Sequence, residues 1–261
     1  MDVRANGIDI HYTLTGEGPS IVFSHSLACN GGEWDEQVQE LSRRFRVVCV
    51  DTRGHGKTTA PAGDYSLDQL ADDLKGLLDT INVKQPHFCG LSMGGMIGQA
   101  AALKYPGIFK TITLADTTSR YAPEAKPLWE GRVKTAREQG MPAIVQGTLD
   151  RWLTESFRKA NVARTEQIAG YIRSTPVAGY TGCIAAISKI DTTDRLREIR
   201  APALVICGEL DAGTPPAMSH AINKAMPGST LVLIPNAAHL SNVDQPEAFT
   251  RALTTFIAKH S

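Results

Sequence analysis

The chain has 261 residues, of which 42% are hydrophobic, and its acidic and basic side chains balance at 27 each. This length is sufficient for one α/β domain with a large buried core. A net charge of zero provides no overall field to attract nucleic acid or an anionic membrane surface, so we expect neither as a partner.

The cysteines and the first residues predict a protein of a reducing compartment. The five cysteines are odd in number and mostly lie in apolar segments, which is typical of packed thiols rather than of a disulfide framework. The start, MDVRANGIDIHY, has neither the cationic flank nor the apolar stretch of a signal peptide. No apolar run approaches the ~20 residues of a membrane span. We therefore expect a soluble, cytoplasmic protein, of an oligomeric state that the sequence leaves undetermined.

Six short runs rich in β-branched residues predict the strands of a mostly parallel sheet. Each is apolar and closed by polar or turn residues, as strands buried on both faces are. They are SIVFSHS at 20–26, FRVVCVD at 45–51, PHFCGLS at 86–92, FKTITLAD at 109–116, PALVICGELD at 202–211 and STLVLIPN at 229–236.

Helical patterns alternate with these runs at 66–83, 92–106 and 246–260. The first repeats leucine at helical spacing and begins with Ser66 and Gln69, the signature of a capping box. Alternating strands and helices predict an α/β fold with helices flanking the central sheet.

The alternation breaks once, between about residues 117 and 200. This stretch has helical periodicity without a strand-like run, and it is far longer than the ~12–20 residues of a usual connection between parallel strands. It predicts a helical lid at 117–200, inserted before the last two strands of a core made of residues 1–116 and 201–261. Ordinary crossover helices are the weaker alternative because they need fewer residues.

The stretch Gly90-Leu91-Ser92-Met93-Gly94 ends a predicted strand and opens a predicted helix. It fits the pattern G-x-S-x-G of a nucleophile elbow, a turn so sharp that the serine has strained backbone geometry and only glycine leaves room for neighbouring segments. A glycine-rich helix start with an N-cap serine has the same letters. The interpretation of Ser92 as a nucleophile therefore depends on partners further along the chain.

A nucleophilic serine needs a base, and the base needs a carboxylate that fixes its tautomer. In a site built on this elbow, the chain order is serine, acid, histidine. His239 is the predicted base, because it follows the last predicted strand in a loop that can reach over the sheet edge. His220 lies in a helical run, and His260 is the penultimate residue.

The segment ICGELDAGTPP places Glu209 and Asp211 just past a strand and before a proline-started helix. Asp211 is the better candidate for the acid, because it lies further into the loop than Glu209. Asp116, which follows the preceding strand, is the alternative acid and also has a plain role as a cap before Thr117.

A tetrahedral oxyanion needs two preorganised N–H donors. One is predicted to be the amide of Met93, the residue after the nucleophile, at the positive end of a helix. The other is expected in the loop after the first parallel strand, where Leu27 is the choice and Ser26 its neighbour. His25 is expected to order this loop by hydrogen bonding rather than to act as a base.

Two patterns are set aside. GHGKTT at 54–59 contains the tail of a phosphate-binding loop, but that motif requires glycine where Asp51 stands, and a turn is the better interpretation. The histidines and cysteines show no metal-ligand spacing. We therefore expect neither a cofactor nor a metal.

Five segments together resemble the α/β-hydrolase superfamily over essentially the whole chain, which implies the α/β-hydrolase fold. They are FSHSLACNGGEWDEQ, DTRGHGKT, GLSMGGMIGQ, GELDAGTPP and NAAHLSNVDQPEAF. Within the superfamily the chain resembles the 3-oxoadipate enol-lactonases of aromatic catabolism. This narrower resemblance lies in the HSL at 25–27 and in lid segments that begin at Trp129, surround Trp152 and begin at Gly179.

The resemblance implies a serine hydrolase that opens 3-oxoadipate enol-lactone to 3-oxoadipate in the β-ketoadipate pathway, through an acyl-enzyme. The free acetate arm of this small anionic substrate requires a fixed cation, best an arginine with its bidentate fork. Arg132 is ranked first because it lies beside Trp129; Trp129 and Trp152 are expected in the lid core or the pocket wall. The other cations of the lid are Arg151, Arg173 and Lys189.

Three other functions are compatible with parts of this sequence. A cofactor-free carboxylesterase or perhydrolase shares the same catalytic residues and differs only in lid and pocket. A hydrolase-like small-molecule binding protein does not need an intact Ser92, Asp211 and His239. A lid that serves mainly as a protein-interaction surface predicts a large exposed apolar patch.

Overall fold

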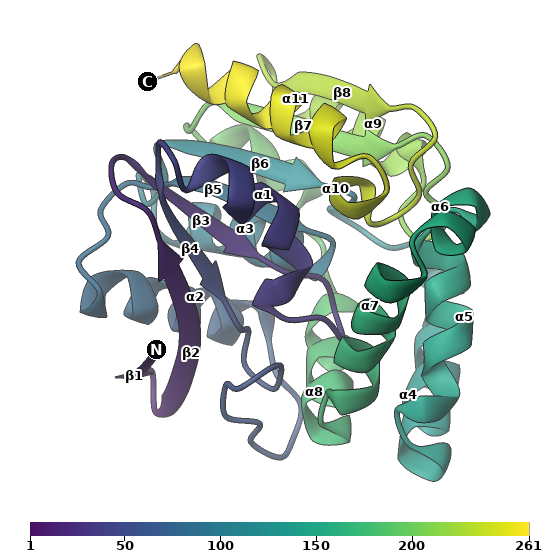
Figure 1. The fold of residues 1–261 in the computed structure, drawn as a ribbon. Coiled ribbons are helices and arrows are strands. Elements are labelled where there is room, and N and C mark those ends of the chain that lie inside the picture. Colours follow the sequence, from purple (N-terminus) through teal and green to yellow (C-terminus); the bar gives the residue numbers. More distant parts are fainter. Residues whose placement is uncertain (261) are drawn as a thin grey trace.

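A computed structural model describes residues 1–260 of the chain. At its centre lies an eight-stranded sheet in the order β1-β2-β4-β3-β5-β6-β7-β8. Helices α1 (Asp35–Leu41) and α11 (Pro246–Ala258) cover one face, and α2 (Leu67–Thr80), α3 (Met93–Lys104) and α9 (Pro216–Ala225) cover the other (Figure 1). The predicted α/β architecture is confirmed.

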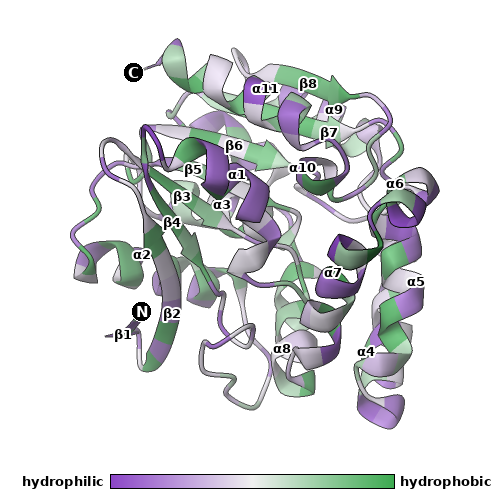
Figure 2. Ribbon diagram, viewed as in Figure 1, coloured by the Kyte–Doolittle hydropathy of each residue, from purple (hydrophilic) through white to green (hydrophobic). Residues whose placement is uncertain are grey.

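The six predicted strands are present and parallel to one another. They are β3 (Ser20–Ser24), β4 (Arg46–Val50), β5 (His87–Leu91), β6 (Thr111–Ala115), β7 (Ala203–Gly208) and β8 (Thr230–Ile234). Burial on both faces is correct for the inner strands, which are mostly green in Figure 2. It is wrong for β8, where only Ile234 is fully buried, because this strand forms the edge of the sheet.

An antiparallel hairpin at the amino end was not predicted. β1 (Asp2–Ala5) pairs with β2 (Ile8–Thr15), and β2 continues the sheet by pairing with β4. The turn is Asn6-Gly7, with positive φ angles of 44° and 78°. An Asn-Gly pair between alternating residues is a strong hairpin signal, so this element could have been predicted.

The three predicted helices are confirmed as α2, α3 and α11. Ser66 caps α2, because its side chain accepts a hydrogen bond from the Gln69 amide at 3.1 Å. The short elements are the 3-10 helix η1 (Gly31–Trp34) and helix α10 (Ser241–Asp244) in the core, and the 3-10 helices η2 (Pro123–Ala125) and η3 (Thr193–Glu198) between β6 and β7.

Five helices lie between β6 and β7, as the predicted insertion before the last two strands requires. They are α4 (Lys126–Gln139), α5 (Pro142–Trp152), α6 (Glu155–Ala160), α7 (Val162–Ser174) and α8 (Val177–Ile187). They gather beside the carboxyl ends of the parallel strands (Figure 1). We call α4 to α8 the helical insertion; its treatment as a separate domain with limits at 117 and 200 stays a prediction.

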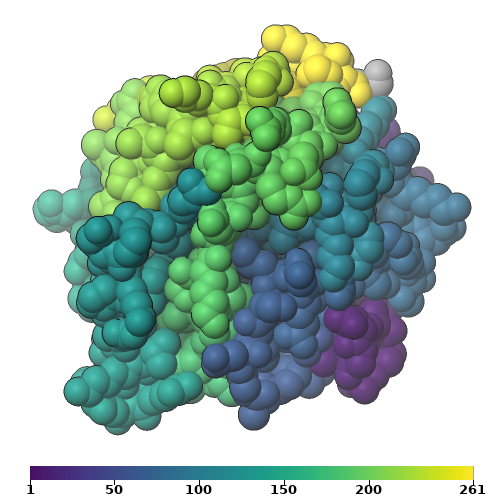
Figure 3. Space-filling view, turned by 180° about the vertical axis from the view of Figure 1, so that it is seen from behind, coloured from purple at the N-terminus to yellow at the C-terminus, as the bar shows by residue number. Residues whose placement is uncertain are grey.

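The helical insertion packs closely on the core. A Cβ added to Gly54 would lie 2.4 Å from Cα of Gly179 in α8, and the Tyr65 amide donates to the Gly182 carbonyl at 3.1 Å. In Figure 3, which views the molecule from behind, the green α8 lies beside a blue segment of the core. Gly54 and Gly179 are therefore glycines because two backbones meet there.

All five cysteines are free and buried, as predicted for packed thiols. Among residues 1–260, no helix combines the length and the apolarity that a membrane crossing requires.

Candidate active site

Ser92 lies in the turn between β5 and α3, with φ 54° and ψ −114°. A positive φ is strained for a residue with a Cβ, so surrounding contacts must hold it. The neighbouring strand β6 supplies them: the Ser92 amide donates to the Ala115 carbonyl at 2.8 Å, and the Thr117 hydroxyl donates to the Ser92 carbonyl at 2.7 Å.

The two glycines of the pattern are sterically required. A Cβ on Gly90 would lie 2.3 Å from the Gly94 carbonyl carbon, and a Cβ on Gly94 would lie 2.1 Å from the Ser24 carbonyl oxygen. The turn at Ser92 can therefore form only because β5 and α3 approach each other and β3 without side chains at these positions.

Asp211 and His239 are brought together at the carboxyl edge of the sheet. The His239 Nδ1 atom lies 3.0 Å from Oδ1 and 2.9 Å from Oδ2 of Asp211, and both residues are buried. Ser92 follows β5, Asp211 follows β7 and His239 follows β8, so all three loops leave parallel strands at the same edge.

The environment of Asp211 favours its ionised form. The amides of Gly213 and Thr214 donate to Oδ1 at 2.7 and 3.0 Å, and the Thr214 hydroxyl donates to Oδ2 at 2.8 Å. Burial alone would raise the pKa of Asp211, but the charge of His239 and these hydrogen bonds outweigh burial and lower it. An ionised Asp211 places the proton of His239 on Nδ1 and leaves Nε2 as a base.

The other candidate acids and bases lie elsewhere. Glu209 is exposed, and His220 is exposed on α9. The ring of His260 lies against Phe256, with 4.6 Å between the centroids, at the end of α11. Asp116 is fully buried, and its oxygens bind Gly208 and Ser241 rather than His239.

Two neutral histidines order the loop after β3. His25 Nδ1 lies 2.7 Å from the Ser26 carbonyl, and His25 Nε2 accepts from the Thr52 amide at 3.0 Å. Burial lowers the pKa of His25 to about 4. His55, whose role the sequence analysis missed, accepts from the Ala28 amide at 2.9 Å; burial lowers its pKa to about 3. Each ring thus holds the loop without a charge.

Two amides of this edge are available to an oxyanion. Among residues 1–260, the N–H groups of Leu27 and Met93 have no hydrogen-bond acceptor. The Ser26 amide, by contrast, donates to Oε2 of Glu33 at 3.1 Å. This difference favours Leu27 over its neighbour Ser26 as a donor to a bound oxyanion.

Glu33 is a buried acid that the sequence analysis did not identify. Its side chain holds the Ser26 amide, while its backbone carbonyl accepts from Asn242 at 3.1 Å and from Arg164 of α7 at 3.2 Å. It therefore ties the loop after β3 to the loop of His239 and to the helical insertion. Burial raises the pKa of Glu33 to about 7.

Trp152 borders the site, whereas Trp129 stands further along the helical insertion. The Trp152 ring centroid lies 6.0 Å from that of His239, and the Trp152 carbonyl accepts from the Leu240 amide at 2.9 Å. Trp129 is buried, and its ring meets Tyr121 edge to face with 5.3 Å between the centroids.

Arg132 is a cation without a carboxylate partner. Its guanidinium carbon lies 4.8 Å from the Trp129 ring centroid, and no carboxylate of residues 1–260 forms an ion pair with it. Arg151 is partly buried, and burial lowers its pKa. The charge of Arg132 lowers this pKa further, so the two guanidinium groups are near each other. Arg173, in contrast, pairs with Glu166 at 3.2 Å on an exposed face.

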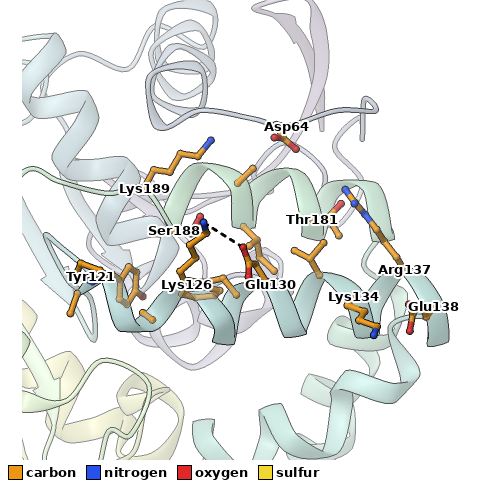
Figure 4. Close-up of a pocket in the computed structure, with 17 residues that line it drawn as sticks. Asp64, Tyr121, Lys126, Glu130, Lys134, Arg137, Glu138, Thr181, Ser188 and Lys189 are labelled. Atoms are coloured by element: carbon orange, nitrogen blue, oxygen red, sulfur yellow. Dashed lines mark ion pairs between the residues drawn. The ribbon is translucent and has the colours of Figure 1, made fainter.

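A cavity of about 840 Å³ opens in the helical insertion, between α4, α8 and the segment before α4. Figure 4 shows Lys189 and Ser188 on one side and Lys126 and Glu130, an ion pair, on the other. Tyr121 and Trp129 are among the residues that line it, but Ser92, Asp211 and His239 are not. Lys189 thus belongs to this cavity rather than to the edge of the sheet.

Asp116, Cys207 and Asp211 place ligand atoms within 4.8 Å of one another in the interior. The oxygens of Asp211 face His239 and the 213–214 turn, and those of Asp116 accept from Gly208 and Ser241. Each carboxylate oxygen already has a hydrogen-bond donor, so the donor set fits a hydrogen-bonded network around the imidazole better than a metal centre.

Known proteins match this chain over nearly its whole length. A family model described as alpha/beta hydrolase fold matches residues 19–246. The 3-oxoadipate enol-lactonase 2 of Acinetobacter baylyi is 35% identical over 253 residues, which cover 96% of this chain and 94% of that enzyme.

Two solved structures share the fold closely. The enol-lactonase from Burkholderia xenovorans LB400 has a TM-score of 0.94 at 35% identity, and the match covers 99% of this chain and 100% of the other. A thermophilic esterase from Thermogutta terrifontis, solved with malate bound, has a TM-score of 0.94 at 30% identity, with 100% and 99% covered.

Proposed function

The chain is a hydrolase that belongs to the alpha/beta hydrolase fold family, and from this premise we propose that it opens 3-oxoadipate enol-lactone to 3-oxoadipate with Ser92 as nucleophile. The single observation that carries a serine mechanism is the buried hydrogen bond between Asp211 and His239, at the sheet edge where Ser92 stands in a strained turn. The similarity to two enol-lactonases supports the choice of substrate.

In the proposed reaction, Ser92 attacks the ring carbonyl of the lactone while Nε2 of His239 takes its proton. Asp211 keeps the imidazole in the required tautomer and stabilises its charged form. The developing oxyanion accepts hydrogen bonds from the amides of Leu27 and Met93, which have no other acceptor among residues 1–260.

Collapse of the tetrahedral intermediate breaks the ring C–O bond. The leaving oxygen departs as an enolate, which takes the proton held by His239, at oxygen or at carbon, and ends as the ketone; the acyl group stays on Ser92 and His239 is again a neutral base. A water molecule activated by His239 then attacks the acyl-enzyme and releases 3-oxoadipate. Because an enolate is a good leaving group, orientation and oxyanion stabilisation are the main tasks of the site.

The acetate arm of the substrate is proposed to bind Arg132. The contacts of this residue support the choice: it stacks on Trp129 and lacks a described ion-pair partner, unlike Arg173. Arg151 lies near enough to add a second guanidinium to the same carboxylate. Trp152, beside His239, is proposed as part of the pocket wall.

A carboxylesterase or perhydrolase is the second candidate, favoured by the similarity to the esterase from Thermogutta terrifontis. A binding protein is a weaker candidate because it does not need the buried pair of Asp211 and His239. An interaction surface on the helical insertion has little support, since Leu128 and Val162 are its only exposed large hydrophobic side chains among residues 1–260. Rates measured side by side on the enol-lactone and on a neutral ester distinguish the two enzymes.

A further inference from the structure

Asp116 occupies an unusual position directly after β6. Its backbone is in the left-handed region, with φ 44°, and its side chain is fully buried. The Asp116 amide donates to the Ile206 carbonyl of β7 at 2.8 Å. A non-glycine residue with positive φ is retained only where surrounding contacts determine it, so the contacts of Asp116 indicate what it does.

The two neighbours of Asp116 in sequence hold Ser92. The carbonyl of Ala115 accepts from the Ser92 amide at 2.8 Å, and the hydroxyl of Thr117 donates to the Ser92 carbonyl at 2.7 Å. Residue 116 thus lies between the two residues that bind the backbone amide and the backbone carbonyl of Ser92.

The side chain of Asp116 joins the two other loops of the site. Its Oδ1 accepts from the Gly208 amide at 2.7 Å, and the Gly208 carbonyl accepts in turn from the Asp211 amide at 3.2 Å. Its Oδ2 accepts from the hydroxyl of Ser241, two residues after His239. One carboxyl group therefore bridges the Asp211 loop and the His239 loop.

The charge state of Asp116 follows from its neighbours. Ligand atoms of Asp116, Asp211 and Cys207 lie within 4.8 Å of one another, and no cation of residues 1–260 pairs with Asp116. Burial first, and then the charge of Asp211, raise the pKa of Asp116 well above its usual range. Burial, the adjacent carboxylate of Asp211 and the lack of a paired cation therefore all favour the neutral form of Asp116.

We propose that Asp116 is a positioning residue that, as a neutral carboxylic acid, holds the Ser92, Asp211 and His239 loops in their working arrangement. This inference rests on the proposed serine mechanism. In the neutral acid, Oδ1 still accepts from the Gly208 amide, while the short contact between Oδ2 and the Ser241 hydroxyl reverses its direction, so that Oδ2–H donates and the hydroxyl accepts. An asparagine has the same shape, with one acceptor for Gly208 and one donor for Ser241, whereas an alanine has neither group.

The test compares Asp116→Asn and Asp116→Ala in the whole chain. The readouts are kcat, KM and the rate at which a fluorophosphonate probe labels Ser92, between about pH 6 and 9, where an ordinary aspartate is fully ionised. We expect Asp116→Ala to slow labelling and kcat by about 100-fold with KM nearly unchanged, as small misplacements of reacting groups do. Asp116→Asn restores the rate to within about threefold of wild type at every pH.

Two further measurements test the proposal even if Asp116→Ala does not fold. Ser241→Ala removes one of the two side-chain bridges and is expected to slow labelling about tenfold, the cost of one hydrogen bond of ordinary strength. The infrared difference spectrum between wild type and Asp116→Asn is expected to contain the C=O band of a protonated carboxyl at neutral pH. The absence of this band would overturn the neutral state.

Three other results would each contradict a different part of the proposal. If Asp116→Asn is as slow as Asp116→Ala, the ionised form is required and the inference is wrong. If Asp116→Ala folds and labels at the wild-type rate, Asp116 has no positioning role. If Ser92→Ala is labelled as fast as wild type, the proposed serine mechanism itself fails, and this result does not depend on any Asp116 variant or on the choice of lactone.

Discussion

Asp211 and His239 are 28 residues apart in sequence, yet the carboxylate oxygen Oδ2 lies 2.9 Å from the ring nitrogen Nδ1, and both side chains are buried. Three donors from Gly213 and Thr214 hold the buried carboxylate as an anion. A buried anion directed at one ring nitrogen prepares the other nitrogen to take a proton.

The hydroxyl of Ser92 is expected to be indispensable. Ser92→Ala removes the nucleophile and should lower kcat on any accepted ester or lactone by at least about 10⁴-fold. Circular dichroism and the thermal midpoint should stay near wild type, because the Ser92 side chain makes no cap hydrogen bond. Ser119→Ala is the matched control, since its buried hydroxyl pairs with Thr193 away from the site. Substantial turnover by Ser92→Ala would exclude Ser92 as nucleophile.

The charge of Asp211 is expected to set the tautomer of His239. Asp211→Asn keeps the shape but presents an amide to Nδ1, so kcat should fall by about 10⁴-fold with a smaller change in KM. Glu209→Gln, a change at an exposed residue, should leave both constants unchanged. A wild-type rate in Asp211→Asn would transfer the role of acid to Asp116 or Glu209.

Glu33 is expected to make stability depend on pH. The pKa of Glu33 is about 7 in the folded protein, above its value in the unfolded chain. The contribution of Glu33 to the free energy of unfolding is therefore fully present below about pH 4.3, and it is lost as pH rises through about 7. Relative to Glu33→Gln, the wild-type free energy of unfolding should therefore fall across this window, by about 3 kcal/mol at most.

Urea unfolding of both proteins across this pH range measures the difference. Glu40→Gln, a change at an exposed glutamate of the adjoining helix, is the control and should follow wild type. Parallel curves for wild type and Glu33→Gln would show that Glu33 does not titrate as a buried acid.

Arg132 is expected to distinguish a charged from a neutral substrate. Arg132→Ala should raise KM for the anionic enol-lactone by about 10- to 100-fold, the value of a hydrogen bond between charged groups, and spare p-nitrophenyl acetate. Arg173→Ala removes a surface ion pair with Glu166 and serves as the matched arginine control. An equal loss on both substrates would assign Arg132 a structural role.

Much of the fold could be predicted because its signals are local. Continuous apolar runs identified the inner strands, and a capping pattern at Ser66 identified α2. The parallel strands also explain why loops far apart in sequence meet at one edge. The hairpin at Asn6-Gly7 was missed although its turn signal is present, and the exposure of β8 depends on its place at the sheet edge, which no local pattern specifies.

The supporting residues of the site were harder to predict because their partners are distant. Glu33 acts on Ser26 and Asn242, and nothing in the segment GGEW indicates that its carboxylate is buried. The bonds from Asp116 to Gly208 and Ser241 span 92 and 125 residues. Sequence motifs therefore indicate candidate reacting groups more readily than the groups that hold them.

The measurement that tests the central claim most directly is the loss of ultraviolet absorbance of 3-oxoadipate enol-lactone when the purified protein is added. Ser92→Ala and the ester p-nitrophenyl acetate are run beside it. The proposed function predicts fast loss of the lactone that requires Ser92, together with slow cleavage of the ester. An unchanged lactone with clear, Ser92-dependent ester hydrolysis would contradict it and make the protein an esterase or a perhydrolase.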